Sequence, residues 1–471
     1  MVPWGNRGEG GGRSIPRTVS LAGAAAAILL VGMVIARSFG LLGPETLLAK
    51  IRREGSLTVF TRVGVTTYYD AAGGAAGFEH DLASAFADHL GIEPRFVVHD
   101  TVPELLAGLA RGDGQIGAAS LPMDASLPAG LRFGPAYGDA QYQLVCHRDG
   151  PVLRDPLSVP GEPVSVLVEG SHEQHLPMMK AFAPALDWAA VYGPTTEDLV
   201  GRVAARKLDC TVGDDTLVAV HRRTHPDLVV PFEIAEPHQL GWALPADAHA
   251  LRAELARWFA MDTTRELIAR LEERYYGHMP DFDYVDFARF ERRVRSRLPR
   301  FRPHFEEAAR ETGQSWELLA AVSYQESHWR PRARSATGVR GMMMLTLSTA
   351  RDLGVKNRLD PVQSIHGGAR YLAGLIERIP DTVGGEDRLW FALAAYNVGY
   401  GHVMDARTLA LRRGLNPDLW ADLKQTLPLL AQKAYYRTVP HGYARGREPV
   451  RYVQQVRHYL DILERLDDRD V

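Results

Sequence analysis

The hydrophobic pattern of this 471-residue chain changes character once, near residue 282. Before that point, short apolar runs such as 57–63 (LTVFTRV) alternate with amphipathic stretches such as 78–91 (FEHDLASAFADHLG). Strands that alternate with helices in this way predict a parallel α/β sheet. After residue 282, apolar residues recur at helical spacing and strand patterns nearly vanish. We therefore expect a multi-domain protein, in which an α/β domain over 46–281 precedes an all-α domain over 282–471.

The α/β rhythm occurs twice within the first domain. A strand at 94–100 and a helix at 102–113 belong to the first set, whereas a strand at 163–170 and a helix at 196–209 belong to the second. Two α/β lobes in one segment predict a ligand cleft between them.

The composition limits which partners the protein can bind and which kinds of chemistry it can perform. The formal net charge is -3, and a dedicated nucleic-acid binder is usually strongly basic, so we expect no nucleic-acid partner. The two cysteines, Cys146 and Cys210, are too few for a disulfide scaffold or a four-thiolate metal site. Both lie in strand-like runs, which favours separate small buried residues but leaves a disulfide open. His328 and His366 do not form an HxxxH pair, and we expect neither a metal nor a cofactor.

The N-terminus carries a basic stretch over 1–18 and then the uncharged run 19–36 (VSLAGAAAAILLVGMVIA), closed by Arg37. This pattern indicates an export signal or an uncleaved membrane anchor, with a slight preference for the anchor. The basic end should remain in the cytoplasm and the rest of the chain should lie outside it. A buried core helix is a less favoured interpretation.

One glutamate of the helical half stands out. In the predicted helix 315–329, Leu319, Val322 and Glu326 share one apolar face. Burial at the end of that face would raise the pKa of Glu326 and keep it protonated near neutrality, as a general acid for glycosidic oxygen requires. The competing interpretation is a glutamate in a salt bridge with nearby Arg330 or Arg334.

Three segments of the α/β half, 55–63, 77–91 and 132–150, resemble the small-solute-binding domains of bacterial uptake systems. This resemblance implies two lobes that close over an amino acid or a similar ligand. It assigns Glu79, Asp81 and Asp214 to the ligand cleft, although Asp214 could instead cap a turn. The arginine that commonly binds a ligand carboxylate is missing from 120–128, which favours a regulatory or docking module over transport.

Four blocks of the helical half resemble the catalytic domain of soluble lytic transglycosylases, relatives of goose-type lysozyme. They are Glu326-Ser327, 338–346 (GVRGMMMLT), 394–401 (AAYNVGYG) and 448–456 (EPVRYVQQV). Because an α/β binding domain precedes these blocks, the whole chain resembles the membrane-bound members of this enzyme family. The family often has Gln where this chain has Met344.

This resemblance implies a role for each matching residue. Glu326 would be the single acid/base, Ser327 would orient it or a sugar N-acetyl group, and Tyr452 would hold its carboxyl. Simple helix packing is the alternative for Tyr452, and core filling is the alternative for Met342. The implied substrate-binding residues are Ser327, Met342, Met343, Met344, Tyr396, Asn397 and Tyr452.

The expected activity is peptidoglycan cleavage between N-acetylmuramic acid and N-acetylglucosamine without water, which forms 1,6-anhydromuramoyl ends. The motif positions offer no second acid, and a hydrolase usually needs one. A lysozyme-type muramidase and a non-catalytic receptor for wall fragments are the alternatives. We expect glycan strands as substrate, a muropeptide or amino-acid-like effector in the α/β domain, and a location at the periplasmic face of a membrane. The resemblance suggests the outer membrane, whereas the long apolar run equally suits an inner-membrane anchor.

Overall fold

The computed structural model describes residues 45–71, 74–153, 155–157, 163–277, 284–335 and 338–467. The stretches 1–18 and 19–36, on which the membrane predictions depend, lie outside the described residues. Among the helices that are described, none is long and apolar enough to cross a membrane. The first of them, α2 (Leu47–Glu54), belongs to a separate unit from the rest of the chain.

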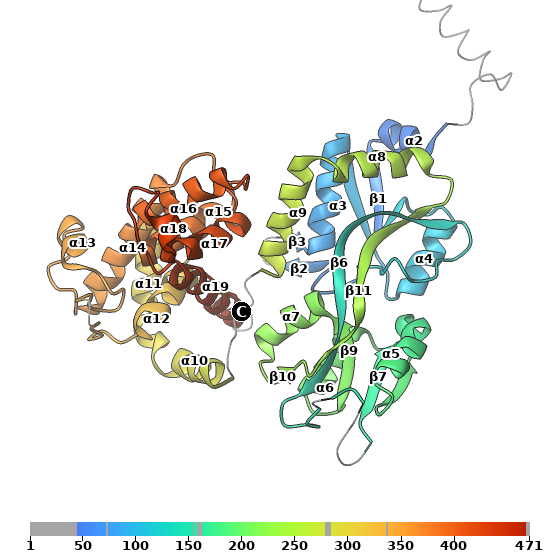
Figure 1. Cartoon of the computed structure of the whole chain (residues 1–471), viewed down its shortest axis with the longest axis horizontal. Helices are drawn as coiled ribbons and strands as arrows, with labels where there is room; N and C mark the ends of the chain where they lie inside the picture. The colour runs from blue at the N-terminus through green and yellow to red at the C-terminus, as the bar shows by residue number, and fades with distance from the viewer. Residues whose placement is uncertain are drawn as a thin grey trace, which may run out of the picture. The chain divides into compact units, whose positions relative to one another are not determined.

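One large sheet organises the α/β domain (Figure 1). Its strand order is β4-β1-β5-β11-β6-β9-β7-β8, and β10 pairs with β6. The strands are β1 (Ser56–Thr61), β4 (Glu93–Val98), β5 (Ile116–Gly117), β6 (Leu131–His147), β7 (Ser165–Glu169), β8 (Asp187–Val191), β9 (Cys210–Asp214), β10 (Leu228–Val229) and β11 (Glu233–Pro245). A separate pair joins β2 (Tyr69–Ala71) to β3 (Gly74–Ala76).

The sheet has two parallel halves joined by two long antiparallel strands. Strand β1 lies parallel to β4 and β5, and β7 lies parallel to β8 and β9. Between these halves, β6 and β11 pair in antiparallel fashion over most of their length. We call β1, β4 and β5 with their helices the first lobe, and β7, β8 and β9 with theirs the second lobe. The predicted two-lobed α/β architecture is thus confirmed.

The helices of both lobes begin and end where their sequences favour it. Helix α3 ends at Gly91, which adopts the left-handed conformation (φ 69°) that favours glycine. Helix α6 begins with a capping box formed by Thr195 and Asp198. The helices are α3 (Phe78–Leu90), α4 (Val102–Ala110), α8 (His249–Phe259) and α9 (Asp262–Tyr275) in the first lobe, and the 3-10 helix η1 (Gly170–His175), α5 (Leu176–Phe182), α6 (Thr196–Ala204) and α7 (Asp215–Thr224) in the second.

The two cysteines form a disulfide. Cys146 and Cys210 face each other in the register of β6 and β9, with 4.3 Å between their Cα atoms. Both residues are fully buried. The favoured interpretation, two separate buried residues, is therefore wrong. The pairing depends on which strands become neighbours, and local sequence patterns do not contain that information.

The second domain is helical throughout its described part. Ser315 is the N-cap of helix α12, and its side chain accepts a hydrogen bond from the Leu318 amide. Asp360 is the N-cap of helix α14, with Pro361 in the first turn. The helices are α10 (Tyr284–Ser296), α11 (Leu298–Thr312), α12 (Trp316–Ser327), α13 (Leu347–Asp352), α14 (Pro361–Arg378), α15 (Asp387–Val398), α16 (Tyr400–Arg412), α17 (Trp420–Thr426), the 3-10 helix η2 (Leu427–Ala431), α18 (Lys433–Tyr436) and α19 (Arg447–Asp467).

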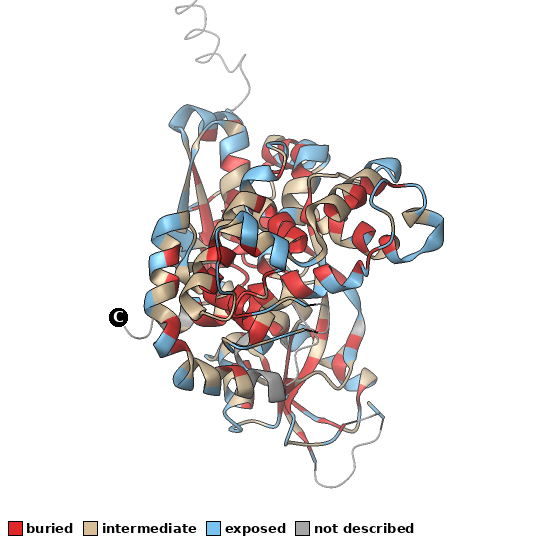
Figure 2. Ribbon diagram, turned by 90° about the vertical axis from the view of Figure 1, so that its left-hand side faces the viewer, coloured by how far each residue is buried: buried red, intermediate tan, exposed pale blue. Residues whose placement is uncertain are grey.

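Helices α12 and α15 form the centre of this domain. Residues 318–324 of α12 are all buried, and so are residues 390–395 of α15. Both helices pack against α19. Figure 2 shows the buried residues gathered in the interior of the helical bundle, with exposed residues on its outer helices. The end of α12 thus brings any polar side chain there into a mostly apolar environment.

Removing the disulfide should destabilise the α/β domain. Cys146 and Cys210 are 64 residues apart, and opening a loop of that size should lower the free energy of unfolding by about 2–4 kcal/mol. Chemical unfolding of the Cys146→Ser/Cys210→Ser double variant, compared with the oxidised wild type, measures this change. The reduced wild type is the matched control, and equal stability of all three forms would contradict the prediction.

Candidate active site

Glu326 lies in the last turn of α12 and meets the C-terminal helix of the domain. The Tyr452 hydroxyl, on α19, donates a hydrogen bond of 2.7 Å to Glu326 Oε1. A second bond joins the same helices one residue away, from Gln325 Nε2 to Gln455 Oε1 at 2.8 Å. Helix α12 then ends at His328, which has a left-handed φ of 54°. The carboxyl is therefore fixed between two packed helices.

Burial governs the protonation of Glu326. It raises the pKa of the Glu326 carboxyl to about 7, and the hydrogen bond from Tyr452 opposes that rise. Among the residues that the structure describes, no charged group contributes to the shift. Within the described part of the chain, no basic residue pairs with Glu326, and Arg330 Nε instead donates to the Ser327 carbonyl. The salt-bridge interpretation of Glu326 is therefore not supported, and a protonated carboxyl exists near neutral pH.

A row of tyrosines extends from the carboxyl. Tyr396 stacks on Tyr452 with ring centroids 6.5 Å apart and an interplanar angle of 13°. The Tyr396 hydroxyl donates to the Met343 carbonyl at 2.8 Å, and Tyr371 packs against Tyr396 with centroids 5.1 Å apart. Burial, together with the charge of Glu326, raises the pKa of Tyr396 and of Tyr452 well above 10. Both phenols therefore remain hydrogen-bond donors at neutral pH.

Tyr371 is a member of this row that the sequence analysis missed. It lies on α14, where Gly368 approaches the second motif closely. A Cβ at Gly368 would lie 2.5 Å from the Met343 side chain. The glycines of GGARY (367–371) are the local signal for this close approach, but nothing in the sequence alone links Tyr371 to Tyr396.

Of the three methionines in the second block, two lie in the core and one is partly exposed. Met342 and Met343 are fully buried in the domain core, which agrees with core filling, whereas Met344 is partly exposed with a φ of 47°. The turn before them requires Gly341, whose φ is 90° and whose Cβ would lie 1.8 Å from the Arg358 carbonyl oxygen. Of the three methionines, Met344 can therefore line a sugar groove directly, whereas the side chains of Met342 and Met343 pack in the core.

Among the described residues, neither Ser327 nor Asn397 forms a hydrogen bond with the Glu326 carboxyl. Ser327 is buried, and its hydroxyl donates to the Ser323 carbonyl at 3.1 Å while it accepts from the Arg330 amide at 3.2 Å. It thus stabilises the end of α12 instead of bonding Glu326. Asn397 is exposed near the end of α15.

The site supplies one carboxyl. Asp405 is buried and accepts hydrogen bonds from the amide and the ring of His441, both at 2.9 Å. Glu448 is exposed and pairs with Arg445. Neither bonds Glu326, and neither contributes to its pKa shift. Among the residues with described positions, no group of three or more His, Cys, Asp or Glu side chains is arranged to hold a metal ion.

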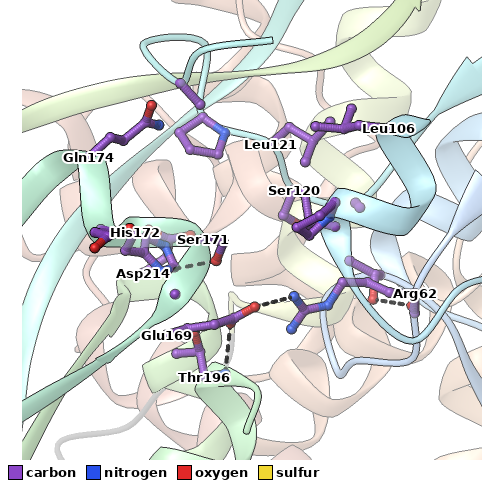
Figure 3. A pocket seen from close by; sticks show the side chains of 18 of the residues that line it. Arg62, Leu106, Ser120, Leu121, Glu169, Ser171, His172, Gln174, Thr196 and Asp214 are labelled. Atoms are coloured by element: carbon purple, nitrogen blue, oxygen red, sulfur yellow. Dashed lines mark hydrogen bonds and ion pairs between the residues drawn. The ribbon is translucent and has the colours of Figure 1, made fainter. Parts of the chain in front are cut away.

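The α/β domain has a cavity of about 410 Å³ between its lobes (Figure 3). Asp214 lines it, as does Arg62, which the sequence analysis did not identify. Glu79 lies elsewhere: it is fully buried and accepts hydrogen bonds from Tyr137, Trp242 and the Ser120 amide. Asp81 accepts a hydrogen bond from Tyr275 on α9. Of the three predicted cleft acids, the structure brings only Asp214 to this cavity.

A two-lobed binding domain, followed by a helical domain with a half-buried glutamic acid held by a tyrosine, defines a modular lysozyme-like transglycosylase. Residues 303–414 match the model of the transglycosylase SLT domain, and residues 59–278 match that of bacterial extracellular solute-binding proteins, family 3. Both matches lie within the predicted domains. The sequence resemblances to these two classes are thereby confirmed.

Two relatives match most of this chain in sequence. A membrane-bound lytic murein transglycosylase F from Maricaulis maris is 47% identical, over 90% of this chain and 93% of its own length. Membrane-bound lytic murein transglycosylase F 1 from Alkalilimnicola ehrlichii is 44% identical, over 90% and 86% respectively. The crystal structure of the ancestral amino acid-binding protein AncCDT-1 covers 49% of this chain and 99% of its own, with 20% identity and a TM-score of 0.41. The chain belongs to the family of membrane-bound lytic murein transglycosylase F.

The raised pKa of Glu326 predicts a specific pH dependence of stability. Because the folded pKa is about 7 and the unfolded pKa is near its ordinary value, the neutral carboxyl favours folding at low pH, and this contribution is lost as the pH rises through 7. Between pH 5 and pH 9 the wild type should therefore lose about 3 kcal/mol relative to Glu326→Gln. Chemical unfolding at both pH values measures the difference. Glu448→Gln, at an exposed site on the same domain, is the control, and parallel pH curves for wild type and Glu326→Gln would refute a buried neutral carboxyl.

Proposed function

We propose that Glu326 is the single acid/base of a lytic transglycosylase that cleaves between N-acetylmuramic acid and N-acetylglucosamine in peptidoglycan. The observation that carries this proposal is the isolated carboxyl itself. Its pKa is about 7, its hydrogen-bond donor is Tyr452, and no second carboxyl among the described residues acts on it. A carboxyl half-protonated near neutrality can serve first as an acid and then as a base.

In the first step, protonated Glu326 gives its proton to the glycosidic oxygen, and the bond from that oxygen to the anomeric carbon breaks. The N-acetyl carbonyl oxygen of the muramic acid then bonds to the anomeric carbon and forms a cyclic intermediate. In the second step, the Glu326 carboxylate removes the proton of the 6-hydroxyl, whose oxygen attacks the anomeric carbon and displaces the acyl oxygen. A 1,6-anhydro sugar forms, no water is consumed, and the proton returns to Glu326. Tyr452 keeps the carboxyl oriented throughout, and its donated bond stabilises the carboxylate between the steps.

Replacing the carboxyl should abolish turnover and leave the fold intact. Glu326→Gln can still accept the Tyr452 bond but cannot transfer the proton, so the rate should fall by at least about 10²–10⁴-fold. Mass spectrometry of digested glycan strands measures both rate and product. Wild-type products should end in anhydromuramic acid, one water lighter than the hydrolysed sugar, and Glu448→Gln should match the wild type. Reducing ends would instead identify a muramidase, and an inactive wild type would favour a non-catalytic receptor.

We also propose that the α/β domain binds a wall-derived peptide and modulates the enzyme. The match to solute-binding proteins and the cavity beside Asp214 support this role. The Asp214 carboxylate faces the cavity and offers a counter-charge to a ligand amine. Binding that favours one arrangement of the lobes would shift the balance between less and more active states.

Effector binding should change the rate of wall digestion. Muropeptides added to the wild type should alter turnover, and Asp214→Asn should weaken that response because it removes the charge opposite the amine. Turnover assays with and without muropeptides measure the effect, with Asp209→Asn, on the loop before β9, as the control variant. The same rate at every muropeptide concentration would argue against coupling.

The remaining proposal concerns location. We propose that residues 19–36 attach the protein to a membrane, that residues 1–18 precede the span in the cytoplasm, and that both folded domains face the periplasm. The pairing of Cys146 with Cys210 supports an oxidising compartment. Amino-terminal sequencing of the mature protein is the test, because an intact Met1 end supports an anchor and a new end after residue 36 identifies a cleaved signal.

A further inference from the structure

The side chain of Arg62 places a guanidinium group in the cleft of the α/β domain. Arg62 follows β1 in the first lobe (Figure 3). It donates one hydrogen bond of 3.0 Å to Glu169 and another of 3.0 Å to Glu197. Glu169 ends β7 and Glu197 lies in the first turn of α6, so both acceptors belong to the second lobe. One side chain therefore connects the two lobes across the cavity.

This contact is shielded from solvent. The exposed fractions of the side chains are 10% for Arg62, 12% for Glu169 and 18% for Glu197. Despite burial, the two carboxylates keep the pKa of Arg62 above its ordinary value, so the guanidinium is charged. Ion pairs in such surroundings are costly to separate one partner at a time, because each remaining charge would be buried without compensation. An exposed arginine pair would not constrain the lobes in this way.

Both lobes are shaped around the contact. On the second lobe, the other Glu169 oxygen accepts bonds from the Thr196 amide at 2.9 Å and the Thr196 hydroxyl at 2.7 Å. On the first lobe, the Thr67 hydroxyl donates to the Arg62 carbonyl at 2.7 Å. Gly64 leaves room for the acceptor, since a Cβ there would lie 2.7 Å from Glu197 Oε1. Supports on both sides fix the positions of donor and acceptors before the lobes meet.

We propose that Arg62 is a built-in latch, which holds the two lobes together through Glu169 and Glu197 when no ligand is bound. The latch goes beyond the proposed effector function and does not depend on it. A ligand that enters must compete with the Arg62 guanidinium for the two carboxylates or settle beside it. Cationic groups are the class of ligand that would displace the latch.

The distance between the lobes tests this proposal directly. Spin labels at Asp88→Cys on α3 and Asp187→Cys at the start of β8 report one lobe each, and both positions are exposed. The native cysteines remain paired and unlabelled. Pulsed electron paramagnetic resonance is measured on the full-length protein in detergent, without wall material or effector. It should give a distribution dominated by one short distance between the two labels. In Arg62→Ala, the ratio of closed to open molecules should fall by about tenfold or more.

A chemical rescue separates the latch from a general loss of structure. Arg62→Ala leaves a gap between two carboxylates that a free guanidinium ion can fill. Guanidinium chloride, at concentrations far below those that unfold the protein, should restore the short distance, whereas equal sodium chloride should not. Arg265→Gln is the matched control, because Arg265 forms an exposed pair with Asp262 inside α9.

Glu197→Gln provides a second variant if Arg62→Ala folds poorly, since it keeps the side-chain volume and removes one of the two charge pairs. It should open the lobes partially. Unchanged distances in Arg62→Ala or, where that variant misfolds, in Glu197→Gln would overturn the latch, and so would equal opening in Arg265→Gln or rescue by sodium chloride. Because no substrate or effector is present, these outcomes are independent of the roles proposed for Glu326 and Asp214.

Discussion

A half-buried, desolvated carboxyl held by one phenol is the interaction on which the candidate active site depends. Desolvation raises the pKa of Glu326, while the bond from Tyr452 lowers it, and the balance is a pKa of about 7. Either influence alone would be unsuitable for the acid/base role that we propose for Glu326. A fully solvated glutamate would stay ionised at neutral pH, and one buried without a donor would hold its proton too strongly. The surrounding bundle maintains this balance by keeping α12 and α19 in contact.

Each domain contains a desolvated glutamate, and the energetic cost of that desolvation is offset differently in the two domains. Glu326 avoids the cost of a buried charge by remaining partly protonated. Glu169 in the other domain remains charged because Arg62 and Thr196 compensate it, and these contacts hold its pKa below the ordinary value although burial opposes them. The first arrangement leaves a proton available for chemistry. The second creates a connection between lobes, because the compensating charge comes from the opposite side of the cleft.

Local sequence patterns predicted most of the elements, and the resemblance to soluble lytic transglycosylases pointed to Glu326 as the acid. Contacts between distant segments could not be predicted in this way. Ser315, Asp360 and Gly91 act on their own helices, so their capping roles could be predicted from neighbouring residues. The apolar face of α12 likewise indicated a buried Glu326. The disulfide required the register of β6 against β9, and the role of Arg62 required the approach of residues 107 and 135 positions away. Met342 and Met343 are fully buried, and the sequence block alone could not separate core filling from groove lining.

The separation of Glu326 from Tyr452 makes the site a property of the whole helical domain. The hydrogen bond joins residues 126 positions apart. Between them in sequence lie the turn at Gly341, the close packing of Gly368 on Met343, and Tyr396, which links the Met343 carbonyl to the Tyr452 ring. Each of these contacts restricts where α19 can lie relative to α12. Because a shift of α19 would lengthen the bond that lowers the pKa of Glu326, packing far from the carboxyl sets its proton affinity. The acid strength of Glu326 therefore depends on contacts among segments that are far apart in the sequence.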